Sequence, residues 1–161
     1  VLALVFAQRT SSPPPTSAPS RGAEAACRRL SLRLPDTLDG AARNTAAGEG
    51  PFIAAWGKPP ILLRCGVPRP TQLAPYSTAQ LIGSGDDLSV NWLPVTYGDA
   101  TVWTTVDRSV FIAVSVPTSY ATPPINALSN VIARTLPVVC TVSMPAGMNA
   151  PGSGVLCTHR P

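Results

Sequence analysis

The stretch ATVWTTVDRSVFIAVSV, residues 100–116, decides the fold. The apolar side chains of its second half occupy alternate positions: Val110, Ile112, Val114 and Val116. This alternation is what a half-buried strand requires, and the first half is also rich in β-branched and aromatic residues. The polar residues 107–109 between the halves predict a turn. We therefore predict an antiparallel hairpin that ends at Pro117.

Further strands and two helices are predicted around this hairpin. The strands are residues 52–56, 61–64, 79–82 and 88–95. An amphipathic helix is predicted over residues 23–34, and a second one begins at the proline pair 123–124, with Thr122 as its N-cap, and ends at Pro137. Residues 36–49 contain glycine turns and are predicted to be a loop. This order predicts an α+β fold, in which an antiparallel sheet carries two helices packed on one face and is stapled by disulfides.

The two ends of the chain differ in composition from its middle. Residues 1–7 are predicted to be the remnant of a signal peptide or membrane anchor, and residues 8–22 a Pro/Ser-rich disordered stalk. The α+β domain then spans residues 23–137, and residues 138–161 form a Gly/Pro-rich C-terminal extension. A hydrophobic fraction of 45% requires a buried core, whereas a net charge of +4 is too small for a nucleic-acid footprint. We therefore expect an extracytoplasmic protein, secreted or anchored at the cell envelope, with no nucleic-acid partner.

Four cysteines support this location, because an even number in an exported chain usually means disulfides. We favour Cys27 with Cys65 and Cys140 with Cys157 among the three pairings that are possible, since the second pair would close the C-terminal segment. Each bond would contribute on the order of 3 to 4 kcal/mol by restricting the unfolded chain. No two cysteines have the spacing of a zinc site, and we expect neither a metal nor a cofactor.

The candidate ligand-binding residues come from WGKPPILLRCGVPRP, residues 56–70. Prolines stiffen this segment, and its two arginines would grip a carboxylate or a phosphate. The candidates are Trp56, Arg64 and Arg69. The alternative is a rigid turn between strands, whose arginines pair with Asp36, Asp39 or Asp99.

An enzyme would need an acid–base constellation that the sequence does not display. Its single histidine, His159, lies next to the chain end. A hydrolase would have to use Asp86, Asp87, Asp99 or Asp107, with Arg64 as an electrophilic clamp. We therefore expect no catalytic residues and keep an envelope hydrolase as a rival interpretation.

The same residues 56–70 carry a resemblance. Together with the Cys27 helix, the LPDTLDG of residues 34–40 and the NWLP of residues 91–94, they resemble the actinobacterial domain-of-unknown-function family 3515. The resemblance covers residues 27–137. Its members resemble exported or membrane-anchored envelope proteins, and their genes often lie near those for D-alanine ligation, which associates the family with the cell wall.

This resemblance implies the pairing of Cys27 with Cys65, and it implies no catalytic residue. Cys140 and Cys157 lie outside the region that it covers. Where the family usually has an aspartate, this chain has Asn91.

The function we expect is that of a non-catalytic binding or accessory module of the cell envelope. Its expected partner is an envelope protein or a cell-wall component, near the membrane through the N-terminal leader. A structural subunit of an envelope complex is the alternative, beside the hydrolase.

Overall fold

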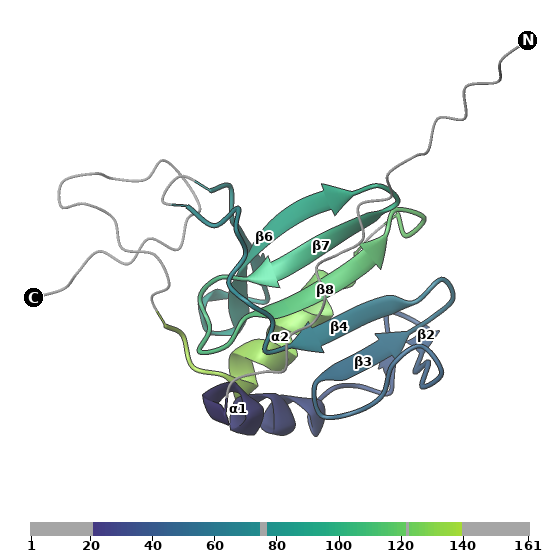
Figure 1. The fold of residues 1–161 in the computed structure, drawn as a ribbon, viewed down its shortest axis with the longest axis horizontal. Helices are drawn as coiled ribbons and strands as arrows, with labels where there is room; N and C mark the ends of the chain where they lie inside the picture. The colour runs from purple at the N-terminus through teal and green to yellow at the C-terminus, as the bar shows by residue number, and fades with distance from the viewer. Residues whose placement is uncertain (1–20, 75–76, 122, 140–161) are drawn as a thin grey trace, which may run out of the picture.

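The computed structural model describes residues 21–74, 77–121 and 123–139. In chain order its elements are α1 (Arg21–Ser31), β1 (Thr37–Leu38), β2 (Ala41–Ala42), β3 (Ile53–Trp56), β4 (Ile61–Cys65), β5 (Gln80–Gly83), the 3₁₀-turn η1 (Asp86–Leu88), β6 (Ser89–Tyr97), β7 (Ala100–Thr105), β8 (Ile112–Pro117) and α2 (Ile125–Thr135). Six strands form one sheet in the order β3-β4-β8-β7-β6-β5, and every neighbouring pair is antiparallel. The predicted α+β class is confirmed (Figure 1).

The two helices cover the same face of this sheet. In Figure 1, α2 lies behind the strands and α1 lies along the lower border. The buried residues of α1 are Ala23, Ala26, Cys27 and Leu30, and those of α2 are Ile125, Leu128, Ser129 and Ile132. They share one core cluster with the inward side chains of the sheet. At its centre, the indole Nε1 of Trp92 donates a hydrogen bond of 2.8 Å to Ser129 Oγ, which satisfies both buried polar groups.

A disulfide between Cys27 and Cys65 joins α1 to β4, with a Cα–Cα distance of 5.6 Å. The predicted pairing of these two cysteines is confirmed. Cys140 and Cys157 lie outside the described residues, so their pairing stays a prediction.

The hairpin of residues 100–116 forms as predicted, with β7 and β8 paired from Ala100 and Pro117 to Thr104 and Ala113. The other expected strands also form, with ends shifted by one or two residues. The first helix ends at Ser31, earlier than predicted, and Thr122 lies outside the described residues.

Two segments predicted as loop, or not assigned, have structure of their own. Residues 36–49 contain the small hairpin of β1 and β2, whose turn places Asp39 and Gly40 at φ values of 47° and 84°. The crossing segment, described as residues 66–74 and 77–79, lies on the face of the sheet opposite the helices and contributes to a second, smaller apolar cluster there. The buried members of this cluster are Leu73, Ala79, Leu93 and Val106. This crossing segment builds the site described next.

Candidate functional site

A cavity of about 360 Å³ lies on the face of the sheet that the helices leave uncovered. Its floor follows from the strand register. One row consists of directly paired residues across β4, β8, β7 and β6: Leu62, Ser115, Val102 and Val95. The next row consists of Arg64, Ala113 and Thr104. Because residues two apart in a strand point to the same face, both rows line the cavity together.

Residues 67–72 form the roof of this cavity and contain two of the prolines of the candidate segment. The backbone N–H of Val67 donates to the carbonyl oxygen of Phe111 at 3.2 Å, which holds the start of the roof on the sheet. At its other end, Gln72 Nε2 donates to Tyr97 Oη at 2.9 Å. The roof is therefore tied to the floor at both ends, and proline limits its freedom in between.

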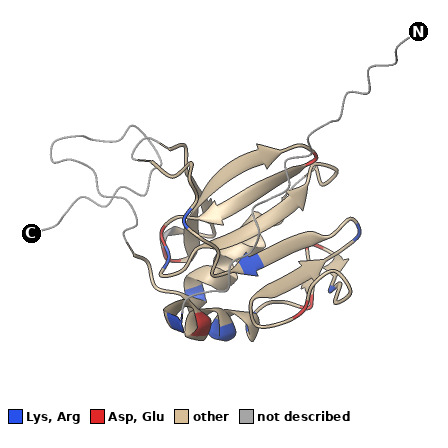
Figure 2. Ribbon diagram, in the orientation of Figure 1, with Lys and Arg blue, Asp and Glu red and all other residues tan. Residues whose placement is uncertain are grey.

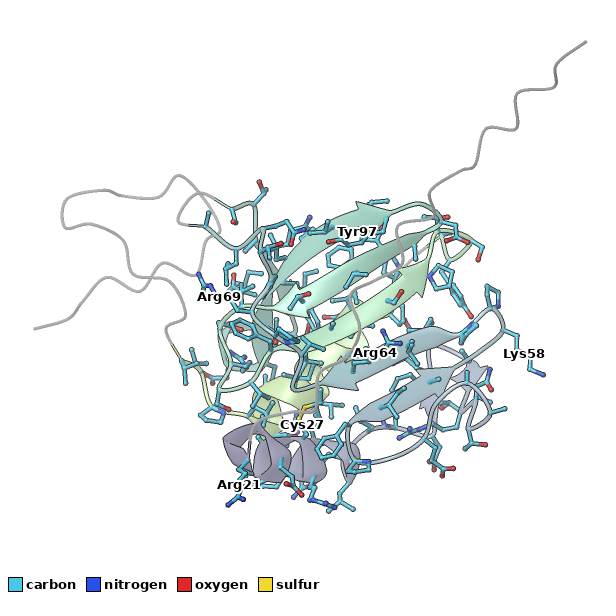
Figure 3. All side chains as sticks on the ribbon, in the orientation of Figure 1. Arg21, Cys27, Lys58, Arg64, Arg69 and Tyr97 are labelled. Atoms are coloured by element: carbon cyan, nitrogen blue, oxygen red, sulfur yellow. A yellow bond between two sulfur atoms is a disulfide. The ribbon has the colours of Figure 1, made fainter. Side chains whose placement is uncertain are left out.

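The charge of the cavity comes from two of the three candidate residues. Arg64 on β4 and Arg69 in the roof both line it, and none of its described lining residues is acidic. Arg69 Nη2 donates to the carbonyl oxygen of Leu73 at 3.2 Å. In contrast, Arg64 makes no hydrogen bond or ion pair with any residue that the structure describes. Figure 3 shows Arg64 on β4, near the centre of the view, and Arg69 in the crossing segment at the left.

Hydroxyl groups complete the polar part of the site. The side chains of Thr104 and Ser115 line the floor, and neither hydroxyl has a hydrogen-bond partner within the described ranges. A ligand in the cavity would therefore meet an apolar floor, free hydroxyls and a cation with open donors. This combination suits a molecule with an apolar body and an anionic head.

Trp56, the third candidate, is placed on the opposite face and is fully buried. Its Nε1 donates to the carbonyl oxygen of Pro35 at 2.9 Å, and the guanidinium of Arg43 lies 4.7 Å from the centre of its ring. Arg43 Nε donates to the same Pro35 oxygen at 3.0 Å. The tryptophan thus fixes the chain after α1 to β3 and does not line the cavity.

The acidic residues of the rival hydrolase do not meet Arg64 in this cavity. Asp87 and Asp99 are exposed and Asp107 is buried, and none of the three lines it. The side chain of Asp86 lies outside what the structure describes. The predicted pairing of the segment's arginines with aspartates is wrong for Arg64, which has no such partner among the described residues.

A buried ion pair occupies the β7–β8 connection instead of a plain polar turn. Asp107 and Arg108 are 3% and 2% exposed, and Nη1 of the arginine lies 2.9 Å from Oδ2 of the aspartate. Asn91 donates to the same Oδ2 from its backbone N and from Nδ2, both at 3.1 Å. Arg108 Nη2 donates to the carbonyl oxygen of Ser89 at 2.6 Å. The pair therefore fastens this connection to β6, which is a structural role.

Burial also sets the protonation behaviour of this pair. Removal from water raises the pKa of the Asp107 carboxyl, against the opposing effects of the Arg108 charge and the Asn91 hydrogen bonds. The same removal lowers the pKa of the Arg108 guanidinium, against the attraction of Asp107. Asp107 Oδ1 and Arg108 Nε have no hydrogen-bond partner in the described part of the chain, which adds to the cost of burial.

Replacing Asn91 with aspartate should make stability fall as the pH rises. The new carboxyl would face Asp107 Oδ2 where Asn91 Nδ2 now donates at 3.1 Å, so a shared proton is needed and the folded-state pKa of the pair rises above the unfolded value. The stabilisation that the shared proton provides is fully present below the pKa of the unfolded state. It is lost as the pH rises through the higher pKa of the folded state. Thermal unfolding of both proteins between about pH 3 and pH 8 checks this, because the ordinary aspartate pKa of about 3.9 and a raised folded-state pKa both fall between those limits. A difference in Tm that stays constant with pH contradicts it.

The polar floor residues and Tyr97 are functional candidates that sequence reasoning missed. Thr104 and Ser115 lie on strands whose other face is buried, so a polar residue alternating with apolar ones was expected to face solvent. Their position beside Arg64 depends on β4 pairing with β8, and no local pattern encodes that pairing. The available signal was that the outward faces of these strands carry small and polar side chains next to a proline-rich crossing segment.

Two further properties bear on the class of protein. No group of potential metal-ligating side chains occurs in the described ranges. Neither of the helices that the structure describes is long and apolar enough to cross a membrane.

The fold and the cavity define a small, disulfide-linked α+β domain with a ligand-sized, positively charged site. The family model described as "Protein of unknown function (DUF3515)" matches residues 2–141, and the chain belongs to this family. The match begins within the hydrophobic N-terminal run and includes Cys140, so it is wider than the expected residues 27–137. Neither a curated protein nor a solved structure matches the chain.

Proposed function

We propose that this chain is a non-catalytic binding module of the cell envelope, and that its cavity holds an amphipathic molecule with an anionic head group. The observation that carries the proposal is a largely apolar lining that contains Arg64, a half-buried cation that lacks a partner among the described residues. A partly desolvated guanidinium without an acidic neighbour favours a carboxylate or phosphate, with charge-assisted hydrogen bonds to its donors.

The size of the cavity limits the ligand. A water molecule occupies about 30 Å³ in the liquid, so 360 Å³ corresponds to roughly a dozen groups of that size. The volume lies at the lower end of the range for small-molecule sites, which is about 300 to 1,000 Å³. A short acyl or isoprenoid segment with its head group fits this size, whereas a polymer would enter by one end only.

The disulfide supports the location that the proposal assigns. The Cys27–Cys65 bond is compatible with an extracytoplasmic environment, because structural disulfides persist where thiols are oxidised. The predicted leader in residues 1–7 points in the same direction. We propose that the protein is exported and stays at the envelope.

Replacing Arg64 with alanine should weaken the binding of decanoate about 10- to 100-fold, since a hydrogen bond to a charged group contributes about 1.5 to 3 kcal/mol. Decanoate has the size that the cavity admits, and decanol supplies the same chain without the charge. Isothermal titration calorimetry with the full chain measures both affinities, and decyl phosphate separates a phosphate preference from a carboxylate preference. The affinity for decanol should change less than twofold.

The matched control is Arg33→Ala, which removes an exposed arginine that does not line the cavity. It should leave decanoate binding unchanged. The proposal fails if none of the three probes binds, or if Arg64→Ala and Arg33→Ala have the same effect. The alternative of a structural subunit has less support, because the exposed large apolar side chains of the described chain lie on three separate segments: Leu32, Leu81 and Val138.

A further inference from the structure

The outward face of α1 is basic and is unrelated to the cavity. With about 100° between successive residues of a helix, the face opposite the buried residues of α1 carries Arg21, Arg28 and Arg29, and Arg33 follows just beyond the helix end. Glu24 is the one acidic residue of the helix. Figure 2 shows the basic residues gathered along α1, at the border of the molecule.

Three of these arginines are free to bind something else. Arg28 is engaged by Glu24, at 2.8 Å, and lies over the ring of Phe52. The side chains of Arg21, Arg29 and Arg33 make no hydrogen bond or ion pair with the part of the chain that the structure describes. Arg21 and Arg29 are exposed on α1 and Arg33 is exposed two residues beyond its end, so three cations without a partner among the described residues lie in this part of the chain.

An exposed leucine lies within this basic surface. Leu32 is 84% exposed and follows α1 directly, and its backbone N–H donates to the carbonyl oxygen of Arg28 at 3.4 Å, which keeps it next to the last turn of the helix. A single exposed leucine is ordinary on a protein surface, so what is informative is its position next to the arginines of α1. This combination matches the interface of a bilayer, where an apolar group enters the acyl boundary and the guanidinium groups pair with lipid phosphates.

The helix is held rigidly enough to present this surface as a unit. The Cys27 disulfide fastens its buried side to β4, and Pro35, just after it, accepts hydrogen bonds from both Trp56 and Arg43. The chain also enters the described fold at α1, directly after the 20 residues that begin with the predicted leader. If the predicted leader lies in the membrane, α1 is the described element that follows it most closely in the chain.

We propose that the outward face of α1 with Arg21 and Arg29, together with the exposed Leu32 and Arg33 just beyond its end, docks on the surface of a bilayer that contains anionic lipid. Each basic side chain near such a surface strengthens binding about fivefold, and the effect is screened by salt. The net charge of this face is positive, so charge complementarity selects an anionic over a zwitterionic surface. The interaction uses the opposite side of α1 from the disulfide and leaves the cavity open.

Co-sedimentation of the full chain with lipid vesicles tests this surface. Wild type should bind vesicles of equal phosphatidylglycerol and phosphatidylcholine at least about tenfold more tightly than phosphatidylcholine vesicles at low salt, and high salt should remove most of that preference. Because every variant retains residues 1–20, the ratio of the two affinities isolates the effect of the helix from that of the leader.

The decisive comparison is between two single charge reversals. Arg29→Glu should reduce the preference for anionic vesicles about tenfold or more, since it removes one attraction and adds one repulsion. Lys58→Glu changes the net charge equally but lies at the β3–β4 turn, well apart from the labelled Arg21 of α1 in Figure 3, and should change the preference less than twofold. Leu32→Ser should weaken binding to anionic vesicles at both salt concentrations.

Equal effects of Arg29→Glu and Lys58→Glu would overturn the proposal, because net charge alone would then explain binding. So would a wild type without preference for the anionic vesicles. Both variants should bind decanoate like wild type, so that a failure of the surface is distinguishable from a failure of the cavity.

Discussion

Replacing Cys65 with serine should lower the free energy of unfolding by about 4 kcal/mol. The Cys27–Cys65 bond closes a loop with a sequence separation of 38, for which loop-closure entropy gives a stabilisation of this size. Both cysteines are buried, so the serine hydroxyl would also enter the core, where burying it without a hydrogen bond costs stability. Urea unfolding of both proteins under non-reducing conditions measures the difference.

The double variant Cys27→Ser/Cys65→Ser separates the loss of the bond from the loss of either side chain. Its stability should lie near that of Cys65→Ser, because both single changes remove one shared interaction. Wild type in a reducing buffer should approach the same value. A Cys65→Ser protein that melts within about a degree of wild type is incompatible with the pairing, since about 4 kcal/mol corresponds to a shift of many degrees.

Replacing Arg108 with alanine should lower the free energy of unfolding by about 3 to 5 kcal/mol, the usual cost of breaking a buried ion pair. The change would remove the partner of Asp107, leaving a carboxylate that is 3% exposed without its nearest cation. It would also leave the carbonyl oxygen of Ser89 without the donor that now lies at 2.6 Å. Chemical denaturation followed by tryptophan fluorescence measures the loss.

Removing both charges provides the control for this prediction. Asp107→Leu/Arg108→Met should recover part of the lost stability, because no charge then remains buried without a partner. If Arg108→Ala costs less than about 1 kcal/mol, the pair is open to water in solution and behaves like a surface ion pair.

The parts of the fold that the sequence predicts are those that local patterns determine. The hairpin of residues 100–116 is determined by alternation, and both helices by the spacing of their apolar residues and by flanking prolines. The placement of β8 between β4 and β7 depends on contacts between distant segments, which periodicity does not report. The short β1–β2 hairpin was missed because two-residue strands carry no detectable alternation.

The candidate site was predicted in part for the same reason. Arg64 and Arg69 were identified because arginines and prolines crowd into one segment, and the structure brings both to one cavity. Trp56 belongs to the same segment, but it lies on the other face because successive strand residues alternate between faces and Trp56 pairs with the inward Ile61.

The turn residues Asp107 and Arg108 were expected to be an ordinary polar connection. Their side chains instead bond to Asn91 and Ser89 of β6, and Val139 N donates to the Asp107 carbonyl oxygen, contacts between distant segments that no local pattern reports.

The position of β8 in the sheet has a consequence for how the chain matures. Among the strands that the structure describes, β8 is the last to be synthesised and lies between β4 and β7. The α1–β4 portion and the β5–β7 meander therefore have no common sheet until residues 112–117 are present. Such long-range pairing gives a high contact order, which slows folding and keeps early strands open. A nascent chain of this topology completes its sheet late and stays loosely ordered while most of it is already made. For the export that we propose above, such a delay would favour passage across the membrane before folding, followed by closure of the sheet and formation of the Cys27–Cys65 disulfide outside.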